Sequence, residues 1–320
     1  MSQLSINIFL FLAGLGLLIL SSDWLIQSSV KLSFMYRLSP LFIGAVLIAF
    51  GTSAPEAGVS IMASIRDQND IALGNIIGSN IANIGLIVGL CAMLRPFRVS
   101  KSMFKRELPL MLLAVLLLFL LSLDKFISRI DGIMFLVLFL FFCIFAYKGA
   151  RKEFDHNEMS DFTLSKVLKK INSPAAAFFI ILLCLIGVIF AADVMVRSGS
   201  AIAEIFGVKP WIIGLTIFAL GTSLPELVTS LNAVFKKAPT ISIGNIVGSN
   251  IFNILFVLGI AALIRPIAIS PSLLKFELPL LLIFSFALFT VMLTGFTIKR
   301  WEGLLLFVGY LFFLALLFTS

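Results

Sequence analysis

A six-residue stretch that occurs twice carries the residues best suited to chemistry. The two copies read Gly-Thr-Ser-Ala-Pro-Glu at 51–56 and Gly-Thr-Ser-Leu-Pro-Glu at 221–226. Each copy places a carboxylate and two hydroxyls inside a long apolar segment, where an ionisable side chain indicates a functional site. Pro55 and Pro225 have no N–H to donate, so each should break or kink its helix and free carbonyl oxygens. The stretch therefore predicts a cluster of oxygen atoms, and hard cations prefer such ligands.

A second duplicated motif follows each copy of the first. It reads Gly-Asn-Ile-Ile-Gly-Ser-Asn-Ile-Ala-Asn at 74–83 and Gly-Asn-Ile-Val-Gly-Ser-Asn-Ile-Phe-Asn at 244–253. In the first copy Asn75, Ser79 and Asn83 recur every four residues, which places them on one face of a helix. Such a polar stripe either joins neighbouring membrane helices or lines an ion site.

The composition is that of a polytopic membrane protein. The chain has 320 residues, of which 60% are hydrophobic and 12% charged, and its mean hydropathy is +1.14. A soluble domain of this size could not bury so much apolar surface. The net charge of +8 could suggest a nucleic-acid partner, but the Lys and Arg residues lie between apolar runs, so membrane topology explains them better. We expect a lipid bilayer around the protein, no nucleic acid and no obligate protein partner.

Ten apolar segments are predicted to be transmembrane helices: 5–22, 41–65, 71–94, 107–123, 130–147, 175–197, 211–234, 241–264, 277–295 and 301–319. The first is predicted to continue past Asp23 to near Arg37 as one long, tilted helix. Asp23 and its copy Asp193 are either interfacial carboxylates or members of an ion path. Residues 148–174 mix basic and acidic side chains and are predicted to form a solvated loop.

The second half of the chain repeats the first. Adding 170 to a residue number aligns the halves without a gap from Asp23 to Leu110, which indicates an internal duplication. Five segments per repeat is an odd number, so the second copy must enter the membrane in the opposite orientation. The expected fold class is an all-α integral membrane protein with ten transmembrane helices, arranged as two inverted five-helix repeats (1–147 and 175–320) around the loop 148–174.

The basic residues predict the orientation of the chain. Loops on the side that includes 148–174 carry 17 Lys and Arg residues, and loops on the other side carry 7. By the positive-inside rule the first side is cytoplasmic and both termini lie outside. We expect a multi-pass protein of a prokaryotic inner membrane.

Inversion predicts that Glu56 and Glu226 meet near the centre of the bilayer. Two carboxylates buried alone would repel each other and take up protons, whereas one divalent cation or two or more sodium ions would neutralise them. Neutral oxygens are expected around them from Thr52, Ser53, Thr222, Ser223, Ser79, Ser249, Asn83 and Asn253. A cluster of this kind, without Cys or His, suits calcium at about 2.3–2.6 Å and also sodium, and it disfavours soft metals.

The four motif copies resemble the two alpha-repeats of the sodium/calcium exchanger family, in the cation/calcium antiporter superfamily, and the chain looks like a prokaryotic member. The resemblance covers essentially the whole chain. It implies that Glu56 and Glu226, with oxygens of Thr52 and Thr222, hold calcium. It also implies sodium sites formed by Ser53, Ser79 and the carbonyl of Ala49 and, in mirror image, by Ser223, Ser249 and the carbonyl of Ala219, with Asn83 and Asn253 at the centre. Three sodium ions would enter as one calcium ion leaves, by alternating access, with segments 1 and 6 sliding across a fixed core.

The chain departs from the family pattern at one central position. Well-known exchangers carry Asp at the position of Asn253, and the potassium-dependent branch carries Asp at both central positions, but here both Asn83 and Asn253 are amides. Potassium coupling is therefore not expected. Two formal charges remain, so a 3:1 stoichiometry rests on the resemblance and not on the charge count.

The leading hypothesis is a sodium/calcium antiporter whose ions are cargo, with no resident cofactor. A cation/proton antiporter on the same scaffold is the nearest alternative, because Glu56 and Glu226 could carry protons. A passive cation channel built on two half-helix motifs is a further alternative. An enzyme is not expected, because no His, Cys or Asp pair lies at membrane depth to act as acid and base.

Overall fold

The protein is nearly all helical. The structure, a computed structural model, describes residues 3–152, 168, 171, 173–206 and 219–317. Among these, eight helical stretches are long and apolar enough to cross a membrane, and a ninth is a pair of helices that meet at a bend. The predicted segment 211–234 lies partly outside the described residues, which resume at Ala219.

Four of the spans are single helices: α1 (Gln3–Tyr36), α9 (Arg129–Lys152), α11 (Pro174–Ile205) and α18 (Arg300–Leu317). The predicted long first helix is confirmed, because α1 passes Asp23 and ends at Tyr36. The predicted loop 148–174 is corrected at its start, since α9 continues to Lys152.

The other spans change helix type along their length. Two are α-helices interrupted by a π-helical stretch: α5 (Asn69–Ala82), η2 (Asn83–Val88) and α6 (Gly89–Leu94), and, in the second half, α15 (Pro239–Ile251), η6 (Phe252–Val257) and α16 (Leu258–Ile264). Two more begin with a short helix: α7 (Lys101–Lys105), α8 (Glu107–Leu121) and the 3₁₀ turn η3 (Ser122–Asp124), and, in the second half, η7 (Leu273–Glu277) and α17 (Leu278–Leu293). The bent span comprises α2 (Pro40–Phe42), η1 (Ile43–Ile48), α3 (Ala49–Thr52) and α4 (Ala54–Ile65). Its counterpart is described as α13 (Ala219–Thr222) and α14 (Leu224–Phe235).

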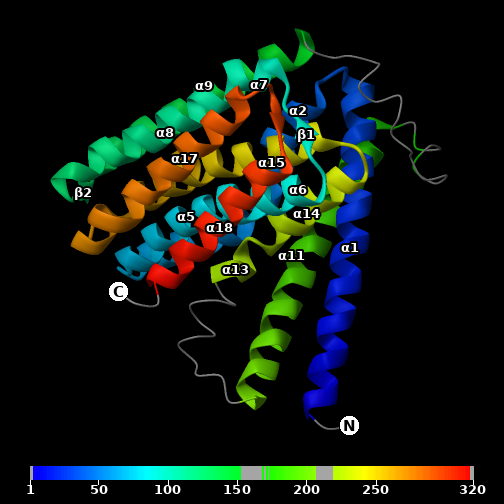
Figure 1. The fold of residues 1–320 in the computed structure, drawn as a ribbon, viewed down its shortest axis with the longest axis horizontal. Coiled ribbons are helices and arrows are strands. Elements are labelled where there is room, and N and C mark those ends of the chain that lie inside the picture. Colours follow the sequence, from blue (N-terminus) through cyan, green and yellow to red (C-terminus); the bar gives the residue numbers. More distant parts are fainter. Residues whose placement is uncertain (1–2, 153–167, 169–170, 172, 207–218, 318–320) are drawn as a thin grey trace.

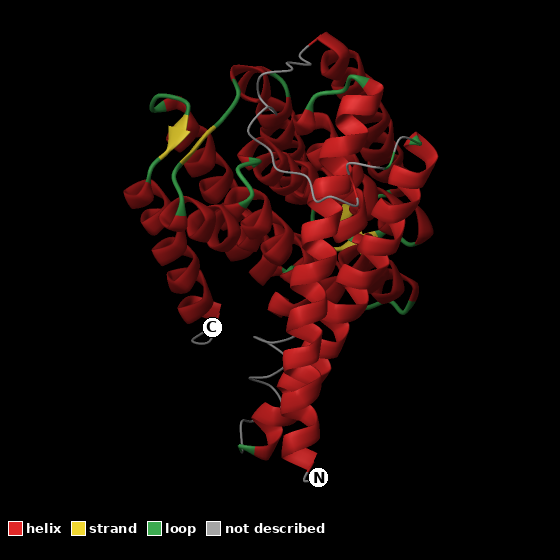
Figure 2. Ribbon diagram, turned by 90° about the vertical axis from the view of Figure 1, so that its right-hand side faces the viewer, coloured by secondary structure: helices red, strands yellow, loops and turns green. Residues whose placement is uncertain are grey.

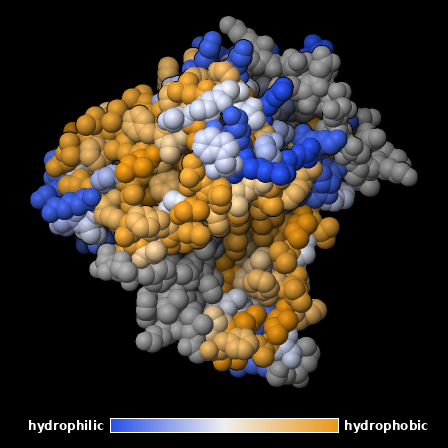
Figure 3. Space-filling view, viewed as in Figure 1, coloured by the Kyte–Doolittle hydropathy of each residue, from blue (hydrophilic) through white to orange (hydrophobic). Residues whose placement is uncertain are grey.

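The longest helices, α1 and α11, stand side by side and extend away from the remaining helices (Figures 1 and 2). Apolar side chains on them are exposed, among them Phe9 and Leu20 of α1 and Ile186 of α11. Apolar residues also cover most of the face shown in Figure 3. This is the surface that lipid would cover in a membrane protein.

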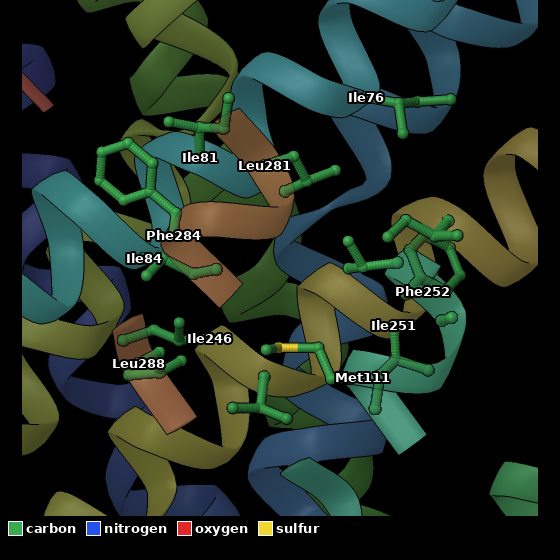
Figure 4. Close-up of a cluster of buried hydrophobic side chains, with 14 of the residues drawn as sticks. Ile76, Ile81, Ile84, Met111, Ile246, Ile251, Phe252, Leu281, Phe284 and Leu288 are labelled. Carbon is green, nitrogen blue, oxygen red and sulfur yellow. The ribbon is translucent and has the colours of Figure 1, made fainter. Parts of the chain in front are cut away.

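The core lies around α5 and α15, which are the most buried spans. Isoleucines of both helices meet side chains of α8 and α17, including Met111 and Leu281 (Figure 4). Small residues let these helices approach closely. A Cβ at Gly44 of η1 would lie 2.6 Å from the carbonyl oxygen of Ile241, and one at Gly248 of α15 would overlap the backbone of Ala45. The second copy of the polar motif, in α15, therefore packs directly against η1, the stretch that precedes the first copy of the glutamate motif.

Four two-residue strands, which the sequence did not predict, join the two halves of the chain. β1 (Phe97–Arg98) pairs antiparallel with β4 (Thr297–Ile298), and β2 (Phe126–Ile127) pairs antiparallel with β3 (Ile267–Ala268). The pairs bring together the loops after the third and ninth predicted segments, and those after the fourth and eighth. Equivalent loops of the two halves thus lie in different sheets, as expected for inverted repeats.

Candidate functional site

Both copies of the first motif break their helix at the serine. α3 ends at Thr52, α4 begins at Ala54, and the axes of the two parts of this span meet at 49°. Ser53 and Ser223 have nearly the same backbone angles, φ −83° and ψ 9° against φ −87° and ψ 4°. The break follows from the proline two residues later, which cannot donate to the preceding turn. The predicted interruption is confirmed in both halves.

The two motif glutamates are buried in the first turns of α4 and α14. Each is held by a hydroxyl of the other repeat. Ser53 Oγ donates to Glu226 Oε1 at 2.7 Å, and Ser223 Oγ donates to Glu56 Oε1 at 3.2 Å. The spacing within one helix suggested that each serine would share a face with its own glutamate, but the break redirects it across the repeat boundary.

The motif threonines differ in their hydrogen bonds. Thr52 Oγ1 donates to Asn245 Oδ1 of the other repeat at 3.2 Å. Thr222 Oγ1 is buried and has no hydrogen-bond partner in the described part of the chain. Ala49 precedes the first break, and its carbonyl accepts the Ser53 N–H at 3.0 Å. Ala219 is the first residue of α13, and its side chain lies outside the described part of the chain.

The polar stripe of the second motif divides into two roles. Asn75 Nδ2 donates to Ser60 Oγ at 2.8 Å and to the carbonyl of Glu56 at 3.2 Å, and Asn245 Nδ2 donates to Ser230 Oγ at 3.2 Å. These amides join α5 to α4 and α15 to α14. Ser249 Oγ instead reaches Glu226 Oε1 at 3.5 Å. The stripe thus serves both as interhelical contact and as lining of the site.

Six oxygens of predicted site residues are buried and have no hydrogen-bond partner in the described part of the chain. They are Glu56 Oε2, Glu226 Oε2, Ser79 Oγ, Thr222 Oγ1, Asn83 Oδ1 and Asn253 Oδ1. A buried polar atom without a partner is costly, and protein interiors contain few of them. In the described residues no three His, Cys, Asp or Glu side chains gather as metal ligands, so the site offers two carboxylates and neutral oxygens.

Sequence reasoning missed Asn80 and Asn250, which are fully buried beside the predicted central residues. Asn253 Nδ2 donates to Asn80 Oδ1 at 3.1 Å, and Asn83 Nδ2 donates to Asn250 Oδ1 at 2.9 Å. The available signal was their duplication within the second motif.

A cavity of about 520 Å³ runs along α5 toward the site. Its lining includes Asp70 in the first turn of α5, Ser79 in the last turn, Thr222 of α13 and Glu277 of η7. Most of the remaining lining is apolar. One side of the oxygen cluster therefore borders this cavity. The carboxylates of Asp70 and Glu277 line the same cavity near the start of α5, at the end of the helix farther from the cluster.

Polar contacts also join α1 of the first repeat to α14 of the second. We call this set the α1–α14 latch (Ser22, Asp23, Asn232 and Lys236). Lys236 Nζ lies 2.7 Å from Asp23 Oδ1, and Asn232 Nδ2 donates to Ser22 Oγ at 3.1 Å. Asp23 is thus paired with a cation on a neighbouring helix.

The equivalent positions of the other repeat are arranged differently. Asp193 pairs with Arg197 of its own helix at 2.8 Å, and Arg66, the counterpart of Lys236, is exposed. A Cβ added at Gly58 of α4 would meet no atom within 4 Å. Among the described residues, the ion pair of the latch is therefore formed between α1 and α14 and has no counterpart between α11 and α4.

These features define a class of multi-pass membrane proteins with a duplicated core and a shared pair of buried glutamates. The chain matches the family described as sodium/calcium exchanger protein over residues 6–148 and 176–319. It belongs to the sodium/calcium exchanger family.

Relatives match over nearly the full length of the chain. The sodium/calcium exchanger MaX1 of Methanosarcina acetivorans is 31% identical over 99% of both chains, and the putative antiporter CaxA of Alkalimonas amylolytica is 35% identical over 97% of this chain and 98% of the relative. The inner membrane protein YrbG of Escherichia coli is 39% identical over 82% and 81%. A solved structure of the sodium-calcium exchanger NCX_Mj superposes with a TM-score of 0.84 at 31% identity, covering 98% of this chain and 99% of that one.

Proposed function

We propose that this protein is a secondary transporter that exchanges sodium for calcium across the membrane by alternating access. The observation that carries the proposal is the set of six unpartnered, buried oxygens, which belong to the two glutamates and to four neutral residues of the predicted site. Hard cations are bound by carboxylate, hydroxyl and amide oxygens, and two carboxylates neutralise one calcium ion. The names of MaX1 and NCX_Mj as sodium/calcium exchangers support the choice of ions.

Each site residue has a role in this proposal. Glu56 and Glu226, with oxygens of Thr52 and Thr222, hold calcium. Sodium binds at Ser53, Ser79 and the carbonyl of Ala49 and, in the other repeat, at Ser223, Ser249 and the carbonyl of Ala219, while Asn83 and Asn253 line the centre. Because sodium and calcium share both glutamates, binding one displaces the other. This competition couples the two fluxes, and no resident cofactor is needed.

Alternating access requires that the site open to one side at a time. The latch joins α1 to α14 at one end, and the cavity along α5 approaches the site from the other. With 148–174 on the cytoplasmic side, Lys236 lies toward the cytoplasm and Asp70 toward the outside, so this conformation faces outward. The name of YrbG supports an inner-membrane location. Movement of α1 and α11 across the core would release the latch and reverse access.

Calcium-45 uptake into sodium-loaded proteoliposomes tests the function, with pH clamped by an ionophore. We expect uptake against a calcium gradient that collapses when sodium is equal on both sides. Uptake driven by a pH gradient and indifferent to sodium would indicate a cation/proton antiporter. Flux that never exceeds the calcium gradient would indicate a channel.

Replacing either glutamate tests the site. Glu56→Gln and Glu226→Gln each remove one charge from a buried pair, and a lost contact to a charged group costs about 3 kcal/mol, or roughly a hundredfold in affinity. We expect initial calcium uptake at low calcium to fall by that factor while the purified protein keeps its size-exclusion profile. Glu204→Gln, at an exposed position of α11, is the control and should transport normally. Uptake within about twofold of wild type in either site variant would refute the assignment.

A further inference from the structure

Four buried asparagines form a hydrogen-bonded group across the boundary between the repeats. Asn80 and Asn83 come from the first half, and Asn250 and Asn253 from the second. The two donations already described run in opposite directions between the halves, from Asn253 to Asn80 and from Asn83 to Asn250. We call these four residues the asparagine tetrad.

The hydrogen bonds of the tetrad favour one orientation of the Asn253 and Asn83 side-chain amides. The amide of an asparagine turns easily, because the rotation about its last bond has a broad, roughly two-fold profile. In the observed orientation the NH₂ group of Asn253 is used by Asn80, and its oxygen is left without a partner. A reversed amide would point N–H bonds at a cation and would place two oxygens against each other at about 3.1 Å.

We propose that Asn80 and Asn250 are positioning residues that fix the amide orientation of Asn253 and Asn83, so that the centre of the site presents carbonyl oxygens to cations. The inference rests on the proposed function, since it concerns the same site. Neither positioning residue needs to touch an ion, because each already uses its own side-chain oxygen as the acceptor for a central amide.

The anchors of the two positioning residues differ in strength. Asn80 Nδ2 donates to the backbone carbonyl of Asn250 at 3.3 Å, whereas Asn250 Nδ2 has the sulfur of Met111 at 3.7 Å as its acceptor. A thioether sulfur is a weak acceptor. The Asn80–Asn253 arm is therefore the more firmly held one, and its disruption should have the larger effect.

The geometry also explains why an amide suits position 253 in this chain. A carboxylate there could not donate to Asn80 Oδ1, and two acceptors would face each other in a buried space. The residue at 80 and the residue at 253 therefore act as a matched pair.

A double-mutant cycle in the full-length protein tests this coupling. The variants are Asn80→Ala, Asn253→Ala and both together, and the readouts are the half-saturating calcium concentration, the maximal exchange rate and the melting temperature. We expect Asn80→Ala to raise the half-saturating calcium concentration about tenfold, and to change it by less than about twofold when Asn253 is already alanine. If Asn80 has only a structural role, Asn80→Ala should lower the melting temperature, and its effect on the half-saturating calcium concentration should multiply with the effect of Asn253→Ala. That outcome would overturn the proposal.

Two further measurements keep the test decisive. Asn80→Ala and Asn83→Ala remove different hydrogen bonds, Asn253–Asn80 and Asn83–Asn250. In the double variant their effects should therefore multiply. If Asn80→Ala does not fold, the mirror cycle of Asn250→Ala and Asn83→Ala replaces it, with a smaller expected effect. Wild-type protein without sodium-driven calcium uptake would refute the proposed function, whereas normal wild-type exchange with independent effects in the cycle would refute the tetrad alone.

Discussion

Ser53 and Ser223 occupy equivalent positions but hold their glutamates to different degrees. Ser53 Oγ lies 2.7 Å from Glu226 Oε1, and Ser249 adds a longer contact to the same oxygen at 3.5 Å. Ser223 Oγ lies 3.2 Å from Glu56 Oε1. Each half-site, meaning one glutamate and the serine that donates to it, contains the same residue types. The serine–glutamate hydrogen bond is shorter in the Ser53–Glu226 half-site than in the Ser223–Glu56 half-site.

This difference predicts unequal serine variants. Hydrogen bonds to charged groups contribute about 1.5–3 kcal/mol, and the shorter bond should contribute more. We expect Ser53→Ala to raise the half-saturating sodium concentration for exchange about tenfold and Ser223→Ala about threefold. The measurement is calcium-45 efflux as a function of external sodium.

Ser230→Ala is the control for the serine variants. Ser230 accepts a hydrogen bond from Asn245 and lies outside the predicted site, so sodium dependence should stay at the wild-type value. A larger effect of Ser223→Ala than of Ser53→Ala would contradict the assignment of the tighter half-site.

Residue types predict which residues belong to the candidate site better than they predict the hydrogen bonds between those residues. Glu56 and Glu226 stand out because a carboxylate in an apolar segment needs a reason, and the duplication marks the rest. The cross-repeat partners could not be predicted, since spacing along one helix does not say where a broken helix sends Ser53. Asn80 was missed because the four-residue stripe led past it, and only the tertiary arrangement brings it against Asn253.

At the scale of elements, the latch connects α1 directly to α14, the helix that carries Glu226. The ion pair between Asp23 and Lys236 is half-buried, and it links a helix of the first half to the motif helix of the second. If α1 moves across the core during transport, this pair must break in every cycle.

Charge exchange at the latch tests that requirement. Partly exposed ion pairs contribute up to about 1 kcal/mol, so Asp23→Asn should change the exchange rate by about two- to fivefold. The double variant Asp23→Lys with Lys236→Asp should return it toward wild type. Asp193→Asn, which removes an exposed pair within α11, is the matched control and should have less effect. A double variant as impaired as the single one would show that the pair is not the relevant contact.

The helices themselves were largely predictable, and their irregularities were not. Apolar runs of the right length predict α1 and the central spans within a few residues, whereas α11 continues past the predicted end at 197 to Ile205. The π-helical stretch that begins at Asn83 inserts part of a turn without changing the apolar pattern, so periodicity cannot detect it. The short strands such as β1 depend on pairing between distant loops, which local propensity does not encode.

At the scale of the whole molecule, the distribution of Lys and Arg predicts that both termini lie outside and that 148–174 is cytoplasmic. A small epitope tag at either end should be labelled by an impermeant antibody in intact spheroplasts. A tag inserted within 148–174 should be labelled only after permeabilisation, which serves as the internal control. Labelling of one terminus alone would contradict the inverted-repeat topology.

The pairing of the short strands bears on how such a molecule could originate and assemble. β1 pairs with β4 and β2 with β3, so each half carries two strands that are completed only by the other half. A single five-segment ancestor could complete them only with a second copy inserted upside down, which requires a chain without preference for either orientation. Fusion of two copies would relieve that requirement, because each half could then acquire its own charge bias and its own latch. The different partners of Asp23 and Asp193 are the kind of divergence that such a fusion permits.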